Sequence, residues 1–122
     1  MFYKQDFGQN GENIAENYLK SIGYFILNRN YRCKQGEIDI IAKDGEEIVF
    51  VEVKTRSSII YGNPAEAVDT YKQKHIRKAA EVYVYSNQLY NCYIRFDVIE
   101  VYLNRQTYRI NHIKQAWDYG NT

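Results

Sequence analysis

Acidic and basic side chains alternate with apolar ones in two neighbouring segments of the chain. The first segment contains Glu37 and Asp39, and the second contains Glu52 and Lys54. Successive side chains of a β-strand point to opposite faces, so these residues share one face within each segment. Carboxylates on one face repel one another unless a cation lies between them, and Mg²⁺ accepts one or two carboxylates together with water and phosphate oxygens. The pattern indicates metal-assisted hydrolysis, with Lys54 orienting or polarising the attacking water.

A simpler interpretation of the same residues needs no metal. Lys54 and Arg56 share the face of the acids and could neutralise them as solvated ion pairs at a sheet edge. Because Asp and Glu are common on strands, spacing alone leaves both interpretations open.

Two residues outside these segments bear on the choice. Glu12 lies at the border of the apolar stripe of a helix expected near the N-terminus. From there its carboxylate either reaches over the sheet or simply favours the helix dipole as a first-turn acid. Lys72 lies near the middle of the apolar stripe of a second expected helix. It either extends along that stripe to solvent or points into a polar pocket and meets a phosphate.

A tight turn is expected to join the two segments. The dipeptide Asp44-Gly45 separates two β-rich runs and is a strong hairpin signal. A turn centred there would place Asp39 opposite Phe50 and Glu37 opposite Glu52. One face of the hairpin would be wholly apolar, with Ile38, Ile40, Val49, Val51 and Val53. The other would hold Ile41, Ile48 and Phe50 near the turn and Glu37, Asp39, Glu52 and Lys54 further away.

The elements that position this hairpin follow from apolar periodicity. A helix is expected over about 11–22, stopped by Gly23, and a strand over about 24–28, before the basic segment 29–34. The hairpin strands span about 37–43 and 47–56. A long helix opens at 62–66, with Pro64 in its first turn, and ends at Ser86-Asn87. Strands over about 93–103 and 107–113 close the chain. The buried face predicted for the long helix is Val68, Tyr71, Ile76, Ala79, Ala80 and Tyr83.

This order predicts the class of fold. The step from the second hairpin strand through the long helix to the strand at 93–103 fits a right-handed βαβ crossover. We therefore predict an α/β fold with a mixed β-sheet flanked by helices. The 122 residues form a single domain, 1–122, by the usual size of one packed core.

Bulk properties exclude several classes of protein. The net charge of +1 is too small for a dedicated nucleic-acid coat, so any phosphate-binding surface must be local. The N-terminal residues lack the apolar run of a signal peptide, and no segment approaches a membrane span. Cys33 and Cys92 stand in isolated contexts and are interpreted as free thiols of a cytoplasmic protein.

The two charged segments also resemble a known motif. Gly36-Glu-Ile-Asp-Ile-Ile-Ala42 followed by Phe50-Val-Glu-Val-Lys-Thr-Arg56 is similar to the core motif of the PD-(D/E)XK nuclease superfamily. More narrowly, the chain resembles the YraN family, a largely uncharacterised bacterial group considered similar to archaeal Holliday-junction resolvases. The resemblance covers nearly the whole chain, and its further parts are Gly8, Gly11-Glu12, Asn30-Tyr-Arg32, Gly62, Pro64, Glu66-Ala-Val68, Lys72 and Arg95-Phe-Asp97.

The resemblance implies a restriction-endonuclease-like αβββαβ core and a site. Asp39 and Glu52 would bind Mg²⁺ or Mn²⁺, with the Val53 carbonyl as a backbone ligand. Lys54 would be the catalytic lysine, and Glu12 would complete the site. Ile38 replaces the proline of the superfamily motif, a departure that is usual in the superfamily.

The expected activity is hydrolysis of phosphodiester bonds of DNA by a metal-dependent endonuclease. The chain shows no element suited to base readout, so selection of branched or junction structures, or non-specific cleavage, is expected. Two other interpretations stay open: a non-catalytic nucleic-acid-binding module with the same fold, and a protein-interaction domain. A homodimer would match a two-fold junction substrate. The candidates for contacts to the nucleic-acid backbone are Arg29, Arg32, Lys34, Arg56 and Lys72.

Overall fold

Helices and strands follow one another in the predicted order. The computed structural model describes residues 10–57, 68–104 and 107–118. The elements are α1 (Asn10–Ser21), β1 (Phe25–Cys33), β2 (Gly36–Asp44), β3 (Glu47–Ser57), α2 (Thr70–Ser86), β4 (Tyr93–Leu103) and β5 (Tyr108–Trp117). The predicted α/β class and the order helix, three strands, helix, two strands are confirmed.

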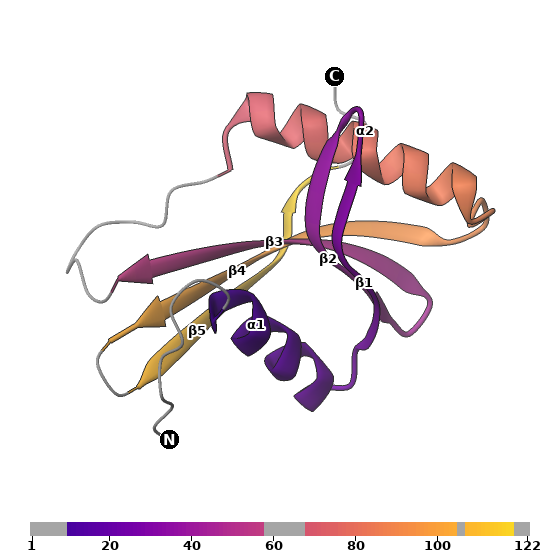
Figure 1. Ribbon diagram of the computed structural model, residues 1–122. Coiled ribbons are helices and arrows are strands. Elements are labelled where there is room, and N and C mark those ends of the chain that lie inside the picture. Colours follow the sequence, from indigo (N-terminus) through magenta and orange to yellow (C-terminus); the bar gives the residue numbers. More distant parts are fainter. Residues whose placement is uncertain (1–9, 58–67, 105–106, 119–122) are drawn as a thin grey trace.

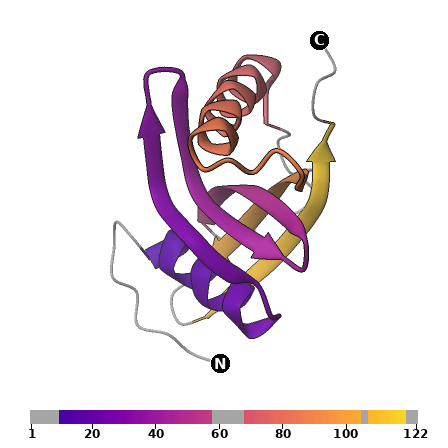
Figure 2. The ribbon, with the colours of Figure 1, turned by 90° about the vertical axis from the view of Figure 1, so that its right-hand side faces the viewer.

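In the part of the chain that the structure describes, five strands form one mixed sheet in the order β1-β2-β3-β4-β5. β3 and β4 run parallel, as a βαβ connection through α2 requires, and the other neighbours are antiparallel. Figure 1 shows α1 and α2 on opposite sides of this sheet. Figure 2 shows the β1–β2 hairpin curling upward alongside α2.

Each face of the sheet is covered by one helix. Alternation along β3 sends Val49 and Val51 into a cluster with α1, and Ile48 and Phe50 into a cluster with α2. Because both of its faces are buried, β3 reads as a nearly continuous apolar run until Glu52. A charged side chain at that point therefore stands out from its surroundings.

The hairpin turn lies one residue later than predicted. Asp44 pairs with Glu47, so Gly45-Glu46 forms the turn. Gly45 has φ 61°, and a glycine at the first central position is typical of type II′ hairpins. The reason lies on β4: Arg95 Nη1 is 3.0 Å from Asp44 Oδ2 and 2.7 Å from Glu47 Oε1, which offsets repulsion between the opposed acids.

The corrected register moves each partner by two positions and therefore preserves most of the predicted faces. Ile41, for example, pairs with Phe50 and not with Ile48. Ile38 is an exception, because it packs in the α2-side cluster and not beside Ile40. The residues of β2 that precede Ile40 pair only with β1, and this part of the hairpin curls alongside α2 (Figure 2). The alternation of its side chains therefore no longer follows the two faces of β3.

The long helix starts later than predicted. Residues 62–66, including Pro64, lie outside the described residues, but Val68 and Asp69 precede the helix. Asp69 is the N-cap and accepts a hydrogen bond from the Lys72 amide at 2.8 Å. Tyr71, predicted to be buried, is 74% exposed in this first turn. The end at Ser86 and the buried face of Ile76, Ala79, Ala80 and Tyr83 are confirmed.

Two strands are longer than predicted. β1 continues through the basic segment to Cys33, because its backbone pairs with β2 as far as Gly36 and an edge strand tolerates polar side chains. β5 continues to Trp117, whose ring stacks on Phe96 at 5.1 Å between centroids. Cys33 and Cys92 are both free thiols, as predicted.

A buried polar network fastens β4 to β5 and α1. Asp97 accepts hydrogen bonds from Arg95 Nε at 2.9 Å and from the Gln115 amide at 3.1 Å. His112 lies between Asp97 and the hydroxyl of Tyr18, at 2.7 and 3.0 Å. Burial opposes the charge of Asp97, but His112, Arg95 and Gln115 together lower its pKa below the ordinary value.

Candidate active site

The candidate site lies where β2 separates from β3. The ladder between these strands ends at Ile40 and Val51. Asp39 directly precedes Ile40 on β2, and its carboxylate accepts a hydrogen bond from the Val53 amide at 2.8 Å. A side-chain oxygen thus serves as the acceptor for this strand amide, and the carboxylate is fixed at the point of separation.

Glu52 meets Asp39 at this point. It is on the α2 face of β3 and only 5% exposed. Burial first, and then the charge of Glu52, raise the pKa of Asp39 to about 7, although the Val53 amide acts in the opposite direction. Asp39 therefore holds its proton up to near neutral pH, and a cation beside the two carboxyls offsets the repulsion between them.

Lys72 supplies such a cation from α2. Its ammonium forms an ion pair with the Glu52 carboxylate. The hydrogen bond to Glu52 raises the pKa of Lys72, although partial desolvation opposes this rise. Lys72 is expected from the sequence either to extend to solvent or to point into a polar pocket. The structure places its ammonium on the Glu52 carboxylate.

Lys54 follows Glu52 on the same face of β3 and is partly buried. Its neighbour across the parallel ladder is Glu100 of β4. Glu100 is fully buried, accepts a hydrogen bond from Asn111 Nδ2 at 2.7 Å and pairs with Arg56 Nε at 3.4 Å. The prediction from sequence missed Glu100. An acid inside an apolar strand is nevertheless a signal for a buried, paired carboxylate.

Glu12 lies apart from this carboxylate pair in its contacts. Its carboxylate pairs with Arg29 Nη2 at 3.3 Å, and Arg29 Nη1 also binds Glu16 at 2.5 Å. Arg29, predicted to contact phosphate, thus fastens β1 to α1 in this structure. The metal-binding role of Glu12 and the phosphate-binding role of Arg29 remain predictions.

Glu37 does not face Glu52, contrary to the predicted register. It pairs instead with Arg32 Nε at 3.5 Å, and both side chains are exposed. The separation of β2 from β3 explains the difference, because residues before Ile40 pair only with β1. Lys34 is exposed in the β1–β2 turn.

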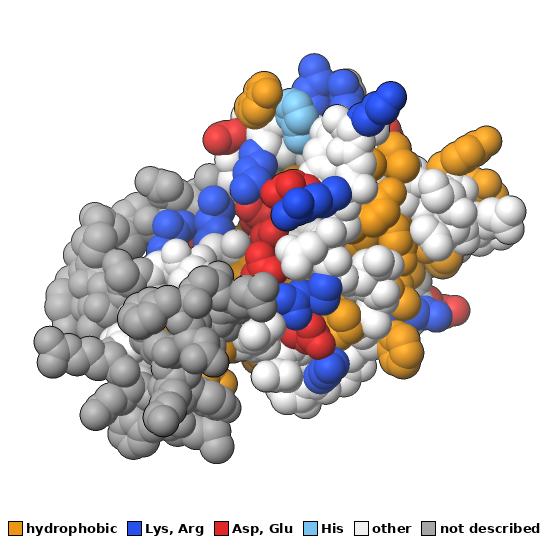
Figure 3. All heavy atoms as spheres, in the orientation of Figure 1, with side chains coloured by type: hydrophobic (Ala, Val, Ile, Leu, Met, Phe, Trp, Pro, Cys, Tyr) orange, Lys and Arg blue, Asp and Glu red, His pale blue; other side chains and the backbone are white. Residues whose placement is uncertain are grey.

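Basic side chains flank the acidic pair. Lys72 comes from α2, Lys54 and Arg56 come from β3, and Arg32 and Lys34 lie at the tip of the β1–β2 hairpin. Figure 3 shows acidic side chains gathered between basic ones on this side of the molecule. Three of these basic side chains are paired with acids: Arg32 with Glu37, Arg56 with Glu100 and Lys72 with Glu52. Their contacts to phosphate remain predictions.

The donor set fits a divalent cation of the Mg²⁺ type. Asp39 and Glu52 offer two adjacent carboxylates, and Mg²⁺ typically binds one or two carboxylates and completes its octahedron with water and phosphate. Burial first, and then the charge of Glu52, raise the pKa of Asp39, and a cation beside the pair would favour its ionised form. Among the described residues, no group of three or more His, Cys, Asp or Glu side chains is arranged to hold a metal ion. The Val53 carbonyl remains a predicted ligand.

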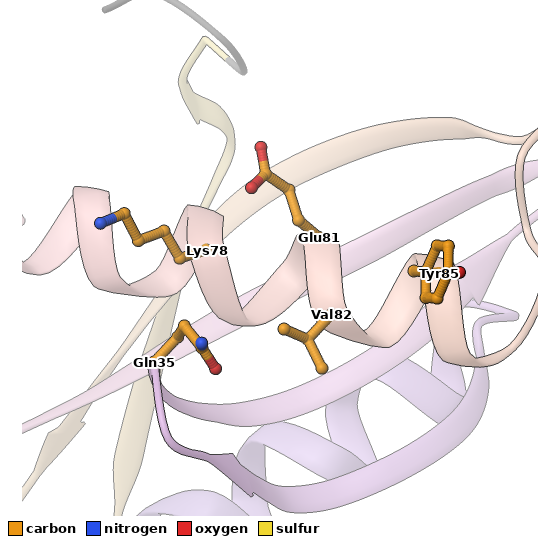
Figure 4. A pocket seen from close by; sticks show the side chains of 5 residues that line it. All are labelled: Gln35, Lys78, Glu81, Val82 and Tyr85. Atoms are coloured by element: carbon orange, nitrogen blue, oxygen red, sulfur yellow. The ribbon is translucent and has the colours of Figure 1, made fainter.

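A pocket of about 470 Å³ lies elsewhere. It is lined by Gln35 of the β1–β2 turn and by Lys78, Glu81, Val82 and Tyr85 of α2. In Figure 4, Val82 points toward the hairpin and Glu81 points away from it. None of the predicted site residues lines this pocket.

In the described residues, the fold is that of an α/β protein with a five-stranded mixed sheet between two helices (Figure 1). The chain belongs to the Uncharacterised protein family UPF0102, the YraN family, whose model matches residues 11–101. It is 51% identical over 116 residues to a UPF0102 protein of Caldicellulosiruptor saccharolyticus, covering 93% of this chain and 98% of the relative. It is 52% identical over 119 residues to a UPF0102 protein of Clostridium botulinum, covering 95% and 97%. In the described ranges, no helix has the length and apolar character needed to span a membrane.

Proposed function

We propose that this chain is a metal-dependent nuclease that hydrolyses phosphodiester bonds of DNA, with Asp39 and Glu52 as metal ligands. The observation that carries the proposal is the contact between these two carboxyls where β2 leaves β3. Two like charges buried side by side destabilise a fold. Such pairs are found mainly where a function requires them, and they therefore concentrate at functional sites.

The chain's own residues supply the other parts of the reaction. Lys54 lies next to the pair on the same face of β3, where its ammonium can stabilise negative charge that develops on a phosphate. Arg56 is held by Glu100 and extends the positive surface along β3. A bound Mg²⁺ or Mn²⁺ would polarise the phosphate and lower the pKa of a bound water.

The proposed substrate is DNA recognised by its backbone. The candidate residues for these contacts are Lys72, Arg56, Arg32 and Lys34. Contacts between basic side chains and phosphates supply affinity but carry no sequence information. Recognition through the backbone therefore favours cleavage of branched or junction DNA, or non-specific cleavage, over sequence-specific cleavage.

The test is cleavage of labelled single-stranded, duplex, flapped and four-way-junction DNA with Mg²⁺ or Mn²⁺. Wild type is compared with Asp39→Asn, which keeps an oxygen that can accept the Val53 hydrogen bond, and with Glu46→Gln in the exposed hairpin turn. Cleavage by wild type and Glu46→Gln, and loss in Asp39→Asn, would support the nuclease. Equal cleavage by all three would reject the site.

A second candidate function is metal-independent binding of nucleic acid. The ion pair between Lys72 and Glu52 favours it, because that pair already neutralises one acid without metal. Binding of the DNA panel in EDTA without cleavage under any metal condition would select this function.

A further inference from the structure

The position of Lys72 in α2 runs against the preference of a helix N-terminus. Asp69 is the N-cap, so Lys72 is the third residue of the helix, and the first turn contains no acid. The positive end of the helix dipole disfavours a cation here, and Glu or Gln at this position would complete a capping box. A residue that breaks a local rule in this way points to a compensating role elsewhere.

The compensation comes from Glu52. Lys72 is 48% exposed, whereas the Glu52 side chain that it binds is only 6% exposed. The ammonium therefore reaches inward from the solvent side and covers the buried carboxylate. Asp39 also interacts with the charge of Lys72, so one ammonium serves both acids.

We propose that Lys72 is the resident counter-ion of the Asp39–Glu52 pair, and that it leaves Glu52 when a divalent cation binds and then contacts a phosphate of the nucleic acid. This inference rests on the proposed function and adds regulation to the same site. The Lys72 ammonium competes with the metal in the free protein and assists the substrate in the metal-bound protein. Metal and nucleic acid consequently bind with positive coupling, and the coupling is reciprocal.

The first consequence concerns metal affinity without DNA. Lys72→Met keeps a long unbranched side chain but removes the competing charge, so it should bind Mn²⁺ about fivefold or more tightly than wild type. Lys72→Arg keeps the charge and should retain an affinity close to that of wild type. Lys74→Met removes an exposed lysine two residues further along α2 and should also bind as wild type does.

The second consequence concerns DNA binding. Wild type should bind a labelled four-way junction more tightly with Ca²⁺ than with EDTA, and Lys72→Met should lose most of this increase. Lys74→Met should keep it. Circular dichroism of each variant establishes that the fold is intact.

The experiment is isothermal titration of Mn²⁺ into wild type, Lys72→Met, Lys72→Arg, Lys74→Met and Asp39→Asn, followed by junction binding with Ca²⁺ or EDTA. Tighter Mn²⁺ binding by Lys72→Met alone, with a reduced Ca²⁺ effect on DNA, would support the counter-ion role. If Lys72→Met binds Mn²⁺ as wild type does while Asp39→Asn loses binding, the metal site stands and the role of Lys72 is wrong. If none of the proteins binds Mn²⁺, the proposed metal-dependent function fails as well.

Discussion

Asp39→Asn should stabilise the metal-free fold in a pH-dependent way. The pKa of Asp39 rises from an ordinary value of 3.8 to about 7 in the folded protein, first because of burial and then because of Glu52. The folded protein therefore holds this proton more tightly than the unfolded chain. The resulting stabilisation is fully present below a pH of about 4 and is lost as the pH rises through about 7.

The size of the effect follows from these two values. Ionising Asp39 costs the fold about 4 kcal/mol at pH 8 and about 1.5 kcal/mol at pH 5. Asparagine has no charge and offers an oxygen to the Val53 amide, so the variant avoids this cost while keeping that hydrogen bond. The free energy of unfolding of Asp39→Asn, relative to wild type, should therefore rise by about 2 to 3 kcal/mol between pH 5 and pH 8.

Urea unfolding in EDTA at both pH values measures this difference. Glu46→Gln, in the exposed turn, is the matched control and should show the same difference from wild type at both pH values. If Asp39→Asn also differs from wild type by the same amount at pH 5 and pH 8, the strained carboxyl pair does not exist in solution. Adding Mg²⁺ should raise the melting temperature of wild type and leave that of Asp39→Asn nearly unchanged.

Three further substitutions test other parts of the structure. Lys54→Met should keep Mn²⁺ affinity but lower DNA cleavage at least about 100-fold, and unaltered cleavage would remove its catalytic role. Gly11→Ala should destabilise the fold by about 1 to 3 kcal/mol in urea, because its Cβ would lie 1.9 Å from Thr55 Oγ1; a stability equal to wild type would contradict this close approach of α1 to β3. Arg95→Met should cost about 3 to 5 kcal/mol, because it removes the cationic partner whose two nitrogens bind the buried Asp97 carboxylate, and a loss below about 1 kcal/mol would show that this ion pair is not needed for stability.

Much of the fold could be predicted because its signals are local. Within the described residues, apolar spacing located both helices and all five strands, although not all of their ends. The ends that were wrong depended on contacts that apolar spacing does not report. The polar end of β1 is held by backbone pairing with β2, and the end of β5 is held by stacking of Trp117 on Phe96. The start of α2 is an exception, because its signal is local. Asp is a preferred N-cap residue, so Asp69 could have been chosen as the start of the helix in place of the segment with Pro64.

The candidate site divides in the same way. The period of two along each strand, together with the Asp44-Gly45 turn between the strands, predicts that Asp39, Glu52 and Lys54 share one face of the hairpin. It did not reveal that the Asp39 carboxylate binds the Val53 amide, because that depends on where β2 leaves β3. Nor did it reveal Glu100, whose role arises from the parallel pairing of β3 with β4.

By itself, the sequence determined the order of the helices and strands and most of the side chains that share a face, because backbone geometry imposes these periodicities over a few residues. The tertiary structure decided the hairpin register through Arg95 of β4, the ion pair of Lys72 with Glu52, and the pairing of Glu12 with Arg29. Each of these is a charge interaction between segments far apart in sequence. Its strength depends on distance and burial, and only the packed arrangement of helices on the sheet sets those two quantities.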